Sequence, residues 1–307
     1  MKHIHKIVLL FALIICGCNA NQGSNRKPVI VRLPARAGIT AVSQKSAPSS
    51  YQYDLKKPDH SWQLQEGLNE ISGNTWVDKD HLIVIEDLDP ELYLLKIDDK
   101  NAAIEKKIEF QKNGKGKFDI EDVTINDGVV YALWSHGVLF KISNWNSSDP
   151  TVEKWPTSLS KDNNTEGVCY DPVTKNLLIA CKDDSGIPGE KKSTKAVYQF
   201  NVQSKMLDQK PFLVIHKEDF KKLTGDDLHF NPSAITIHPV THNIYLLSTR
   251  DNKCMAVYDR TGKLIAFQKI DDELMRQPEG ICFSPDGKLY ISSEGKGHGK
   301  LFEFDPK

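Results

Sequence analysis

The sequence predicts an all-β fold: a β-propeller, most simply of five four-stranded blades closed by an N-terminal strand, with six blades as the alternative. A pattern of strand, turn and strand recurs five times from Ser72 onwards, and its starts are 49, 45, 67 and 46 residues apart. Four antiparallel strands in about 40–50 residues is the period of a propeller blade. A two-sheet sandwich is the other all-β architecture considered, but it does not explain why every repeat starts with Ser or Glu.

Each repeat opens on an apolar strand that begins with Ser or Glu, usually followed by a small residue. These openings are SGNTW from Ser72, EDVTI from Glu121, EGVCY from Glu166, SAITI from Ser233 and EGICF from Glu279. Turns rich in Asp, Asn, Gly and Pro follow: VDKDH, INDGV, DPVTKN, HPVTHN and SPDGK. The second strands are LIVIED, VVYALWSH, NLLIACKDD, NIYLLSTRD and KLYISSEG.

Third strands are expected at ELYLLKID, GVLFKIS, KAVYQFNV, CMAVYDR and GKLFEFD, and the first four repeats add a fourth. The fifth repeat ends after three strands. We expect SSYQYDLKK (49–57) to be the strand that completes it, which would close the ring and cover an exposed sheet edge. The long third interval holds an insertion at 185–194 and a short helix, KEDFKKL (217–223).

The N-terminus is expected to be a lipoprotein signal peptide, residues 1–17. A cationic start precedes nine apolar residues, which suits a secretory signal and is too short to span a membrane. The following ICGC resembles a bacterial lipobox, which implies cleavage before Cys18 and lipidation of its thiol; an ordinary secretory signal is the alternative. Residues 18–48 are rich in Asn, Ser, Gln, Pro and Ala and are expected to form a flexible tether to the propeller at 49–307.

Composition limits the partners. The 40 Lys and Arg residues balance 41 Asp and Glu residues, which argues against nucleic-acid binding. Four cysteines remain beyond residue 18, each in an apolar run without metal-ligand spacing, and we expect buried thiols rather than a disulfide or a metal site. They are Cys169, Cys181, Cys254 and Cys282.

The five strand starts should form a ring at one mouth of the central channel, because the first strand of each blade lines that channel. The ends of the second strands return to the same face. We therefore expect Ser72, Glu121, Glu166, Ser233 and Glu279 to lie beside Glu86, Asp87, His136, Lys182, Asp183, Arg250 and Glu294. Small residues after the starts, at Gly73, Gly167, Ala234 and Gly280, should let the blades approach closely.

Three glutamates held close together would each raise the pKa of the others unless a cation offsets them. Ca²⁺ or another divalent cation would suit Glu121, Glu166 and Glu279, with ligand-binding roles for Ser72, Glu86, Asp87, Lys182, Asp183, Ser233, Arg250 and Glu294. Lys182 and Arg250 could supply the positive charge instead, or one or more of the acids could stay protonated. A purely structural role, in which each Glu accepts backbone N–H groups from the next blade, is the alternative.

Catalytic motifs are missing from the sequence: it has no GxSxG elbow, no phosphate-binding glycine loop and no HExxH helix. Glu166 and His136 are the candidates for a catalytic base.

The chain resembles the SdiA-regulated family of bacterial exported β-propeller proteins. The resemblance rests on NEISG (69–73), NNTEGVCYDPVTKNLLIACKDD, NPSAITIHPVTHNIYLLS and QPEGICFSPDGKLYISSEGKG, and it implies a periplasm-facing propeller without established catalytic residues. The Glu-Gly starts are more loosely similar to gluconolactonase and strictosidine-synthase-like propellers, in which a first-blade Glu helps to hold Ca²⁺. Ser72 stands at that position here, which argues against a lactonase.

Three functional hypotheses follow. The first is a monomeric, lipid-anchored propeller of the cell envelope, on the periplasmic side of the outer membrane, that binds a small ligand or divalent cation at the channel mouth. The second is a metal-assisted hydrolase of a lactone, ester or phosphate ester. The third is a platform for an envelope protein partner. The sequence does not decide whether the protein is an enzyme.

Overall fold

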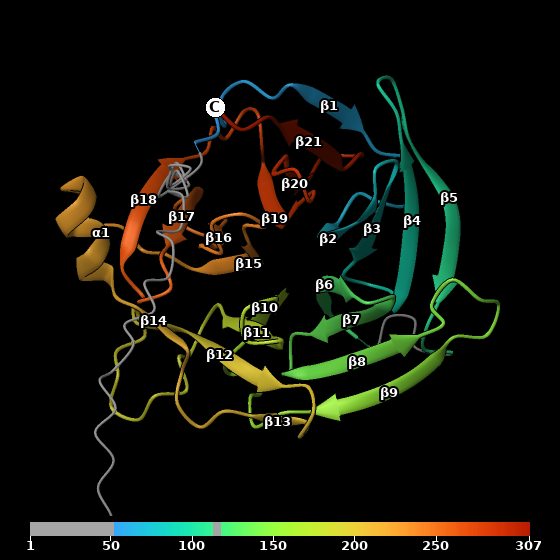
Figure 1. Ribbon diagram of the computed structural model, residues 1–307. Coiled ribbons are helices and arrows are strands. Elements are labelled where there is room, and N and C mark those ends of the chain that lie inside the picture. Colours follow the sequence, from blue (N-terminus) through green and yellow to red (C-terminus); the bar gives the residue numbers. More distant parts are fainter. Residues whose placement is uncertain (1–51, 113–117) are drawn as a thin grey trace, which may run out of the picture. The chain divides into compact units, whose positions relative to one another are not determined.

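A computed structural model describes residues 52–112 and 118–307, all of which belong to the compact unit Ser46–Lys307. In this part of the chain five β-sheets are arranged as blades around a common axis (Figure 1). The predicted all-β, five-bladed propeller is confirmed, and the described residues form no sixth blade. The predicted signal peptide, the lipidation site Cys18 and the tether lie outside the described residues.

Each blade is an antiparallel sheet whose first strand lies nearest the axis. Blade 1 consists of β2 (Ile71–Asp78), β3 (His81–Glu86), β4 (Glu91–Ile97) and β5 (Ala102–Glu109). Blade 2 consists of β6 (Ile120–Asn126), β7 (Val129–Trp134), β8 (Val138–Ser143) and β9 (Thr151–Pro156). Blade 4 consists of β15 (Pro232–Ile237), β16 (Ile244–Ser248), β17 (Cys254–Tyr258) and β18 (Leu264–Lys269).

Blade 3 departs from this plan at its outer edge. It consists of β10 (Thr165–Asp171), β11 (Asn176–Cys181) and β12 (Lys195–Asn201), and two short strands, β13 (Met206–Leu207) and β14 (Leu213–Ile215), share the outer position. The predicted short helix follows as α1 (Lys217–Thr224). Its Phe220 is buried, and Gly225 ends it with a φ of 80°, a left-handed conformation that glycine adopts without steric cost.

Blade 5 joins the two ends of the described chain. It consists of β19 (Gln277–Phe283), β20 (Leu289–Glu294), β21 (Lys300–Phe304) and, at the outer edge, β1 (His60–Gln63). Closure by an N-terminal strand is confirmed, but the predicted segment was wrong: β1 pairs with β21, whereas residues 52–57 form no strand. These residues instead bury Tyr53 and Leu55 in the apolar cluster between blades 4 and 5.

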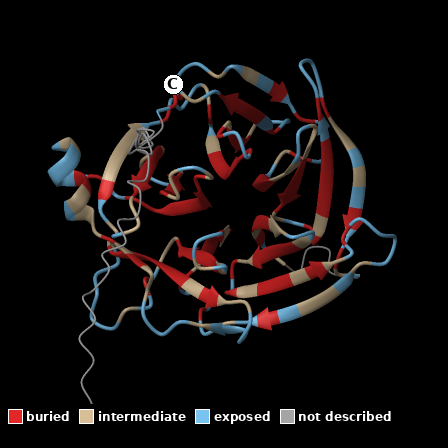
Figure 2. Cartoon of the chain, viewed as in Figure 1, coloured by how far each residue is buried: buried red, intermediate tan, exposed pale blue. Residues whose placement is uncertain are grey.

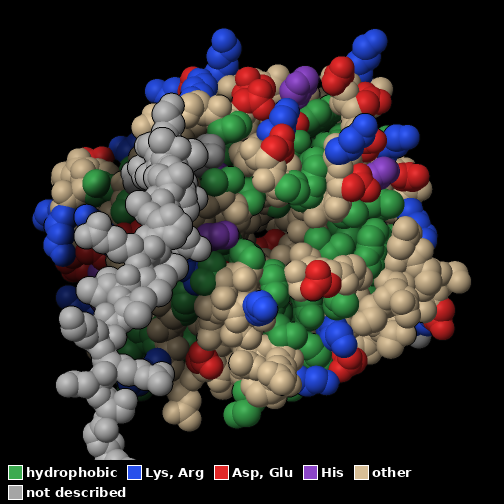
Figure 3. Space-filling view, viewed as in Figure 1, with side chains coloured by type: hydrophobic (Ala, Val, Ile, Leu, Met, Phe, Trp, Pro, Cys, Tyr) green, Lys and Arg blue, Asp and Glu red, His purple; other side chains and the backbone are tan. Residues whose placement is uncertain are grey.

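Five apolar clusters hold the ring together, one at each interface between neighbouring blades. The inner and middle strands are buried almost throughout, and exposed residues concentrate on the outer strands and turns (Figure 2). Acidic and basic side chains are interspersed on the face seen in Figure 3. The four cysteines are buried and free, as predicted, and Cys169 faces Leu178 across the β10–β11 pair. Among the described residues no helix has the length and hydrophobicity needed to cross a membrane.

Candidate functional site: the channel mouth

Every inner strand carries a β-bulge at the position that the sequence repeats share. In blade 1 the register against β3 shifts between Ile71 and Gly73, so Ser72 has no partner on the neighbouring strand. The same shift leaves out one residue in each of the other four inner strands: Glu121, Glu166, Ser233 and Glu279. A bulge turns its extra side chain out of the alternating pattern of the strand. All five predicted ring residues are therefore bulge residues.

Close contact between neighbouring blades explains the glycines that follow three of these bulges. A Cβ atom on Gly73 would lie 2.7 Å from the Cα atom of Asp122 in blade 2. At Gly280 it would lie 2.9 Å from the backbone nitrogen of Asn74, and at Gly167 it would lie 3.0 Å from that of Ile235. Real Cβ atoms essentially never come within 3.0 Å of such atoms, and a contact of 3.0 Å is already unusually tight, so the prediction that small residues permit tight packing near the axis is confirmed at these three glycines.

In blade 2 the residue that follows the bulge is not small. It is Asp122, which is 1% exposed. Its carboxylate accepts hydrogen bonds of 2.8 Å from the backbone N–H groups of Val123 and Val168, and so links blade 2 to blade 3. Burial raises the pKa of Asp122 well above its ordinary value, although both N–H groups act in the opposite direction. Asp122, rather than a ring glutamate, thus accepts backbone N–H groups across the interface between two blades.

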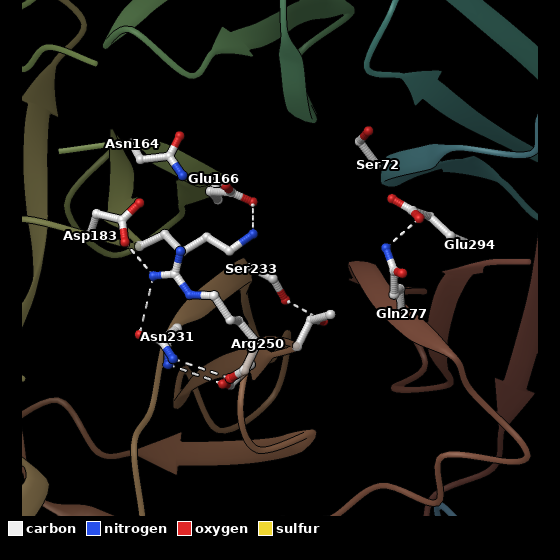
Figure 4. A network of polar contacts seen from close by, with 12 residues as sticks. Ser72, Asn164, Glu166, Asp183, Asn231, Ser233, Arg250, Gln277 and Glu294 are labelled. Atoms are coloured by element: carbon white, nitrogen blue, oxygen red, sulfur yellow. Dashed lines mark hydrogen bonds and ion pairs between the residues drawn. The ribbon is translucent and has the colours of Figure 1, made fainter. Parts of the chain in front are cut away.

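Lys182 lies among the three ring glutamates. Its ammonium group donates a 2.8 Å hydrogen bond to Oε2 of Glu166, and Asn164 donates one of 2.8 Å to Oε1 of the same carboxylate (Figure 4). Burial opposes the charge on Lys182, but Glu166, Glu279 and Glu121 together outweigh this effect and raise its pKa. One of the two basic residues expected to offset the glutamates, Lys182, thus lies among them.

The three glutamates are nevertheless hard to ionise together. Burial and the charge of Glu166 raise the pKa of Glu121 well above its ordinary value. The pKa of Glu166 is raised by burial in spite of Lys182. Glu279, only 9% exposed, has its pKa raised to about 8, mainly by burial, because the charge of Lys182 only partly offsets it. One lysine does not neutralise this group at neutral pH.

A second group of acids continues the ring at blades 1 and 5. Burial and neighbouring carboxylates raise the pKa of Asp87 to about 6 and that of Glu294 to about 7. Burial also raises the pKa of Glu86. Two acceptor atoms here, Oδ1 of Asp87 and Oδ1 of Asn69, are buried and receive no hydrogen bond from any residue in the described ranges. This side of the mouth therefore has more acceptors than donors.

Arg250 and Asp183 form an ion pair that links blades 4 and 3 at the rim (Figure 4). Burial favours the neutral acid, but the hydrogen bond and charge of Arg250 prevail and lower the pKa of Asp183. The structure thus brings the predicted charged residues together as one group, with seven carboxylates and two cations: Glu86, Asp87, Glu121, Glu166, Asp183, Glu279 and Glu294, with Lys182 and Arg250.

The two ring serines are engaged in contacts within the protein. The hydroxyl of Ser233 donates a 3.0 Å hydrogen bond to the carbonyl of Pro278 and so ties blade 4 to blade 5. Ser72 donates one of 3.3 Å to the carbonyl of Glu70 (the side chains of both serines are drawn in Figure 4). Ser233 therefore has a structural role in the ring whether or not it also contacts a ligand.

Neither candidate catalytic base, His136 or Glu166, has a neighbour in the described part of the chain that would activate it as a base. His136 is exposed and stacks on Trp134, with ring centroids 4.5 Å apart, and in the described part of the chain no hydrogen bond or ion pair links it to the ring. Both carboxylate oxygens of Glu166 are already held, by Asn164 and Lys182. A binding role for the mouth needs fewer assumptions than the hydrolase hypothesis.

The mouth side chains do not form a ready metal site. Within residues 52–112 and 118–307, no three His, Cys, Asp or Glu side chains are placed to hold a metal ion together. Lys182 already bonds Glu166, the central member of the predicted ligand set. A divalent cation could be bound by Glu121, Glu166 and Glu279 only after the side chains rearrange.

Sequence reasoning missed a second layer of polar residues at the mouth. The residue two positions before each bulge residue is polar in all five blades: Glu70, Asp119, Asn164, Asn231 and Gln277. The side chains of three of these bond predicted site residues, since Asn164 bonds Glu166, Gln277 bonds Glu294 and Asn231 bonds the backbone of Arg250. Glu70 contacts Ser72 and Glu86 through its backbone. A polar residue at the same place before each repeat start was visible in the sequence.

Known structures share the fold at low sequence identity. Glutaminyl cyclase from Myxococcus xanthus superposes with a TM-score of 0.52 and 14% identity, over 81% of this chain and 99% of that one. The PQQ-bound aldose sugar dehydrogenase from Streptomyces coelicolor gives 0.49 and 12%, over 85% and 99%. A luciferin-regenerating enzyme gives 0.45 and 11%, over 83% and 94%. At such identities the first likeness supports the fold alone.

Comparison with curated protein sequences gives no match. The sequence profile of the SdiA-regulated family, in contrast, matches residues 45–297, which include every strand of the five blades except β21. The resemblance noted from the repeat motifs is confirmed: this chain belongs to the SdiA-regulated family.

Proposed function

We propose that this protein is a lipid-anchored propeller of the cell envelope that binds a small, positively charged ligand, an amine or a divalent cation, at its channel mouth. One observation carries the proposal: five bulge residues lie at one channel mouth, in a group where buried carboxylates outnumber cations. Glu121, Glu279 and Glu294 would contact the ligand, and Lys182 would keep Glu166 in place.

The raised pKa values of the mouth carboxyl groups suggest how a cation would bind there, which is by displacing protons. Glu279, with a pKa of about 8, and Glu294, with a pKa of about 7, hold protons over much of the neutral range. A cation that enters the mouth favours the ionised carboxylates and so displaces protons. The oxygen atoms of Asp87 and Asn69 that lack donors would accept hydrogen bonds from an amine or face a metal ion. Binding should therefore strengthen as the pH rises from about 6 to about 8.

Titration calorimetry tests this proposal directly. Putrescine and CaCl₂ serve as the two probes, each at pH 6 and pH 8 and in two buffers that differ in ionisation enthalpy. We expect at least one probe to bind more tightly at pH 8, with protons released to the buffer, and Glu279→Gln to weaken that binding. The matched control is Glu66→Gln, which changes an exposed loop residue. Absence of heat with both probes, or binding without proton release, would overturn the proposal.

The anchor requires a separate experiment. The sequence ICGC at residues 15–18 supports lipidation of Cys18, and Asn19 is not the acidic residue associated with retention in the inner membrane. We expect incorporation of a labelled fatty acid that is lost in Cys18→Ala, and sedimentation of the wild type with outer membranes. Recovery of unlabelled wild-type protein in the periplasmic fraction would show instead an ordinary secretory signal.

A further inference from the structure

A cavity lies at the end of the inner strands opposite to the channel mouth. It has a volume of about 480 Å³ and lies between blades 1 and 5. The turns Lys79–Asp80 and Pro285–Asp286 line it, and they follow the ends of β2 and β19, whereas the bulges lie at the starts of these strands. This cavity, the blade 1–5 groove, therefore opens at the opposite end of the inner strands. Nothing proposed for the mouth involves it.

Aromatic rings form much of the wall of the groove. Trp62, Trp76 and Tyr290 all line it, and the rings of Trp76 and Tyr290 lie 5.3 Å apart. The indole N–H of Trp62 is engaged, since it donates a 2.8 Å hydrogen bond to the carbonyl of Asp98. Trp76 is partly exposed, and its indole N–H bonds to no residue that the structure describes. Part of Trp76 is thus available to a ligand.

Carboxylates surround these rings. Asp98, Asp99 and Asp286 are exposed, and they line the groove together with Asp80 and Glu303. The two lysines that also line it are already near acids: Lys288 bonds Glu303 at 2.7 Å and pairs with Asp305 at 3.2 Å, and Lys79 lies 3.9 Å from Asp80. The groove therefore has a surplus of negative charge beside aromatic surface.

Elsewhere the chain fills the same kind of environment with its own ammonium groups. Over Trp155 lie the amines of Lys141 and Lys205, 5.5 and 4.9 Å from the ring centroid. Glu153 holds both amines with hydrogen bonds of 2.7 Å. Such pairs combine the attraction of a cation to an aromatic face with the attraction to a nearby carboxylate. In the described part of the chain no Lys or Arg lies over Trp76 in this way.

We propose that the blade 1–5 groove binds an organic ammonium group, methylated or quaternary, over the face of Trp76. A quaternary ammonium group cannot donate hydrogen bonds, so it suits an aromatic wall with carboxylates at the rim rather than a ring of direct carboxylate ligands. The rim charge would also draw cations towards the groove and repel anions. The groove and the mouth thus select cations by different means: aromatic contact here, and exchange for protons there.

Nuclear magnetic resonance gives a local readout. The chain contains five tryptophans, so ¹⁵N-labelled protein shows five indole signals, and Trp76→Phe identifies the signal of Trp76. Choline is the probe, and 3,3-dimethylbutanol, which has the same shape without the charge, is its control. We expect saturable shifts of the Trp76 signal with choline and at least about tenfold weaker binding of the neutral compound.

Variants separate the two parts of the groove. Trp76→Leu should weaken choline binding about tenfold, as followed by calorimetry. Asp99→Asn combined with Asp286→Asn leaves the apolar core intact and should weaken binding about fivefold at low salt. Asp149→Asn, an exposed acid on blade 2, is the matched control and should change nothing.

Three results would overturn the proposal. The first is equal binding of choline and dimethylbutanol, which would indicate an apolar pocket. The second is a shift of the Trp76 signal with methyl glucoside but not with choline, which would indicate a sugar site. The third is choline binding that survives both the Trp76 and the Asp99/Asp286 variants, which would place the ligand elsewhere.

Discussion

Replacing Glu279 with Gln should remove a large pH dependence of stability. The carboxyl is 9% exposed, and no hydrogen bond joins it to another residue in the described part of the chain, so an amide of nearly the same shape leaves no partner unsatisfied. Burial raises the pKa of Glu279 from 4.5 to about 8. Between these two values the folded protein keeps a proton that the unfolded chain has lost.

The sign and size follow from this difference in bound protons. Where the folded state binds more protons, stability falls as the pH rises, and here the fall extends from about pH 4.5 to about pH 8. The rise of the pKa from 4.5 to about 8 corresponds to about 5 kcal/mol in total, of which about 3–4 kcal/mol falls between pH 5 and pH 8. For a domain of this size, each kcal/mol changes Tm by about 2–4 °C. Glu279→Gln should therefore raise Tm at pH 8 by roughly 7–14 °C.

Thermal melts of the two proteins at pH 5, 6, 7 and 8 measure this effect. The difference in Tm should be small at pH 5 and grow steadily to pH 8, while the exposed control Glu66→Gln follows the wild type throughout. Parallel curves for wild type and Glu279→Gln would refute the reasoning, because they would mean that Glu279 ionises as readily in the folded protein as in the unfolded chain.

Three further substitutions probe the ring. Lys182→Met leaves Glu166 buried without its cation, so it should lower the free energy of unfolding by about 3–5 kcal/mol at pH 8. The loss should be much smaller at pH 5, because the carboxyl then takes up a proton. Urea unfolding at both pH values measures this difference. Asp122→Ala leaves two buried N–H groups without an acceptor and should lower the free energy of unfolding by about 2–5 kcal/mol in the same assay. A loss below about 1 kcal/mol would mean that Asp122 does not help to hold blades 2 and 3 together. Gly280→Ala places a Cβ atom 2.9 Å from the backbone nitrogen of Asn74 and should lower stability by about 1–3 kcal/mol; an unchanged Tm would contradict the tight packing of blades 1 and 5.

The sequence was sufficient for the architecture because each strand signal is local. Alternating apolar residues and turns of Asp, Asn, Gly and Pro recur with the period of a blade, and five repeats leave few other arrangements. The closing strand was misplaced because Tyr53 and Leu55 alternate with polar residues as they would in a strand. Their burial between blades 4 and 5 depends on tertiary contacts that no local pattern records.

The site was predicted as a set of residues but not as a geometry. Recurrence placed Glu121, Glu166 and Glu279 in one ring, and the return of the second strands placed Lys182 beside them. The bulge was not predicted, because it is a property of the pairing between two strands rather than of either sequence. The role of Asp122 was missed for a similar reason: its two hydrogen bonds are to backbone groups, which carry no side-chain signature.

Blade 5 is built from both ends of the described chain, and this governs how the ring can assemble. Its outer strand β1 precedes blade 1, and its other three strands follow blade 4, so the pairing of His60 with Glu303 must wait until the intervening four blades have been synthesised. Contacts so remote in sequence slow folding, because a long loop must close before they form. A molecule that has lost β21 would retain four blades but expose the edges of β1 and β20 that β21 otherwise covers. Loss of this one strand should therefore favour association between chains, since an uncovered edge pairs readily with another.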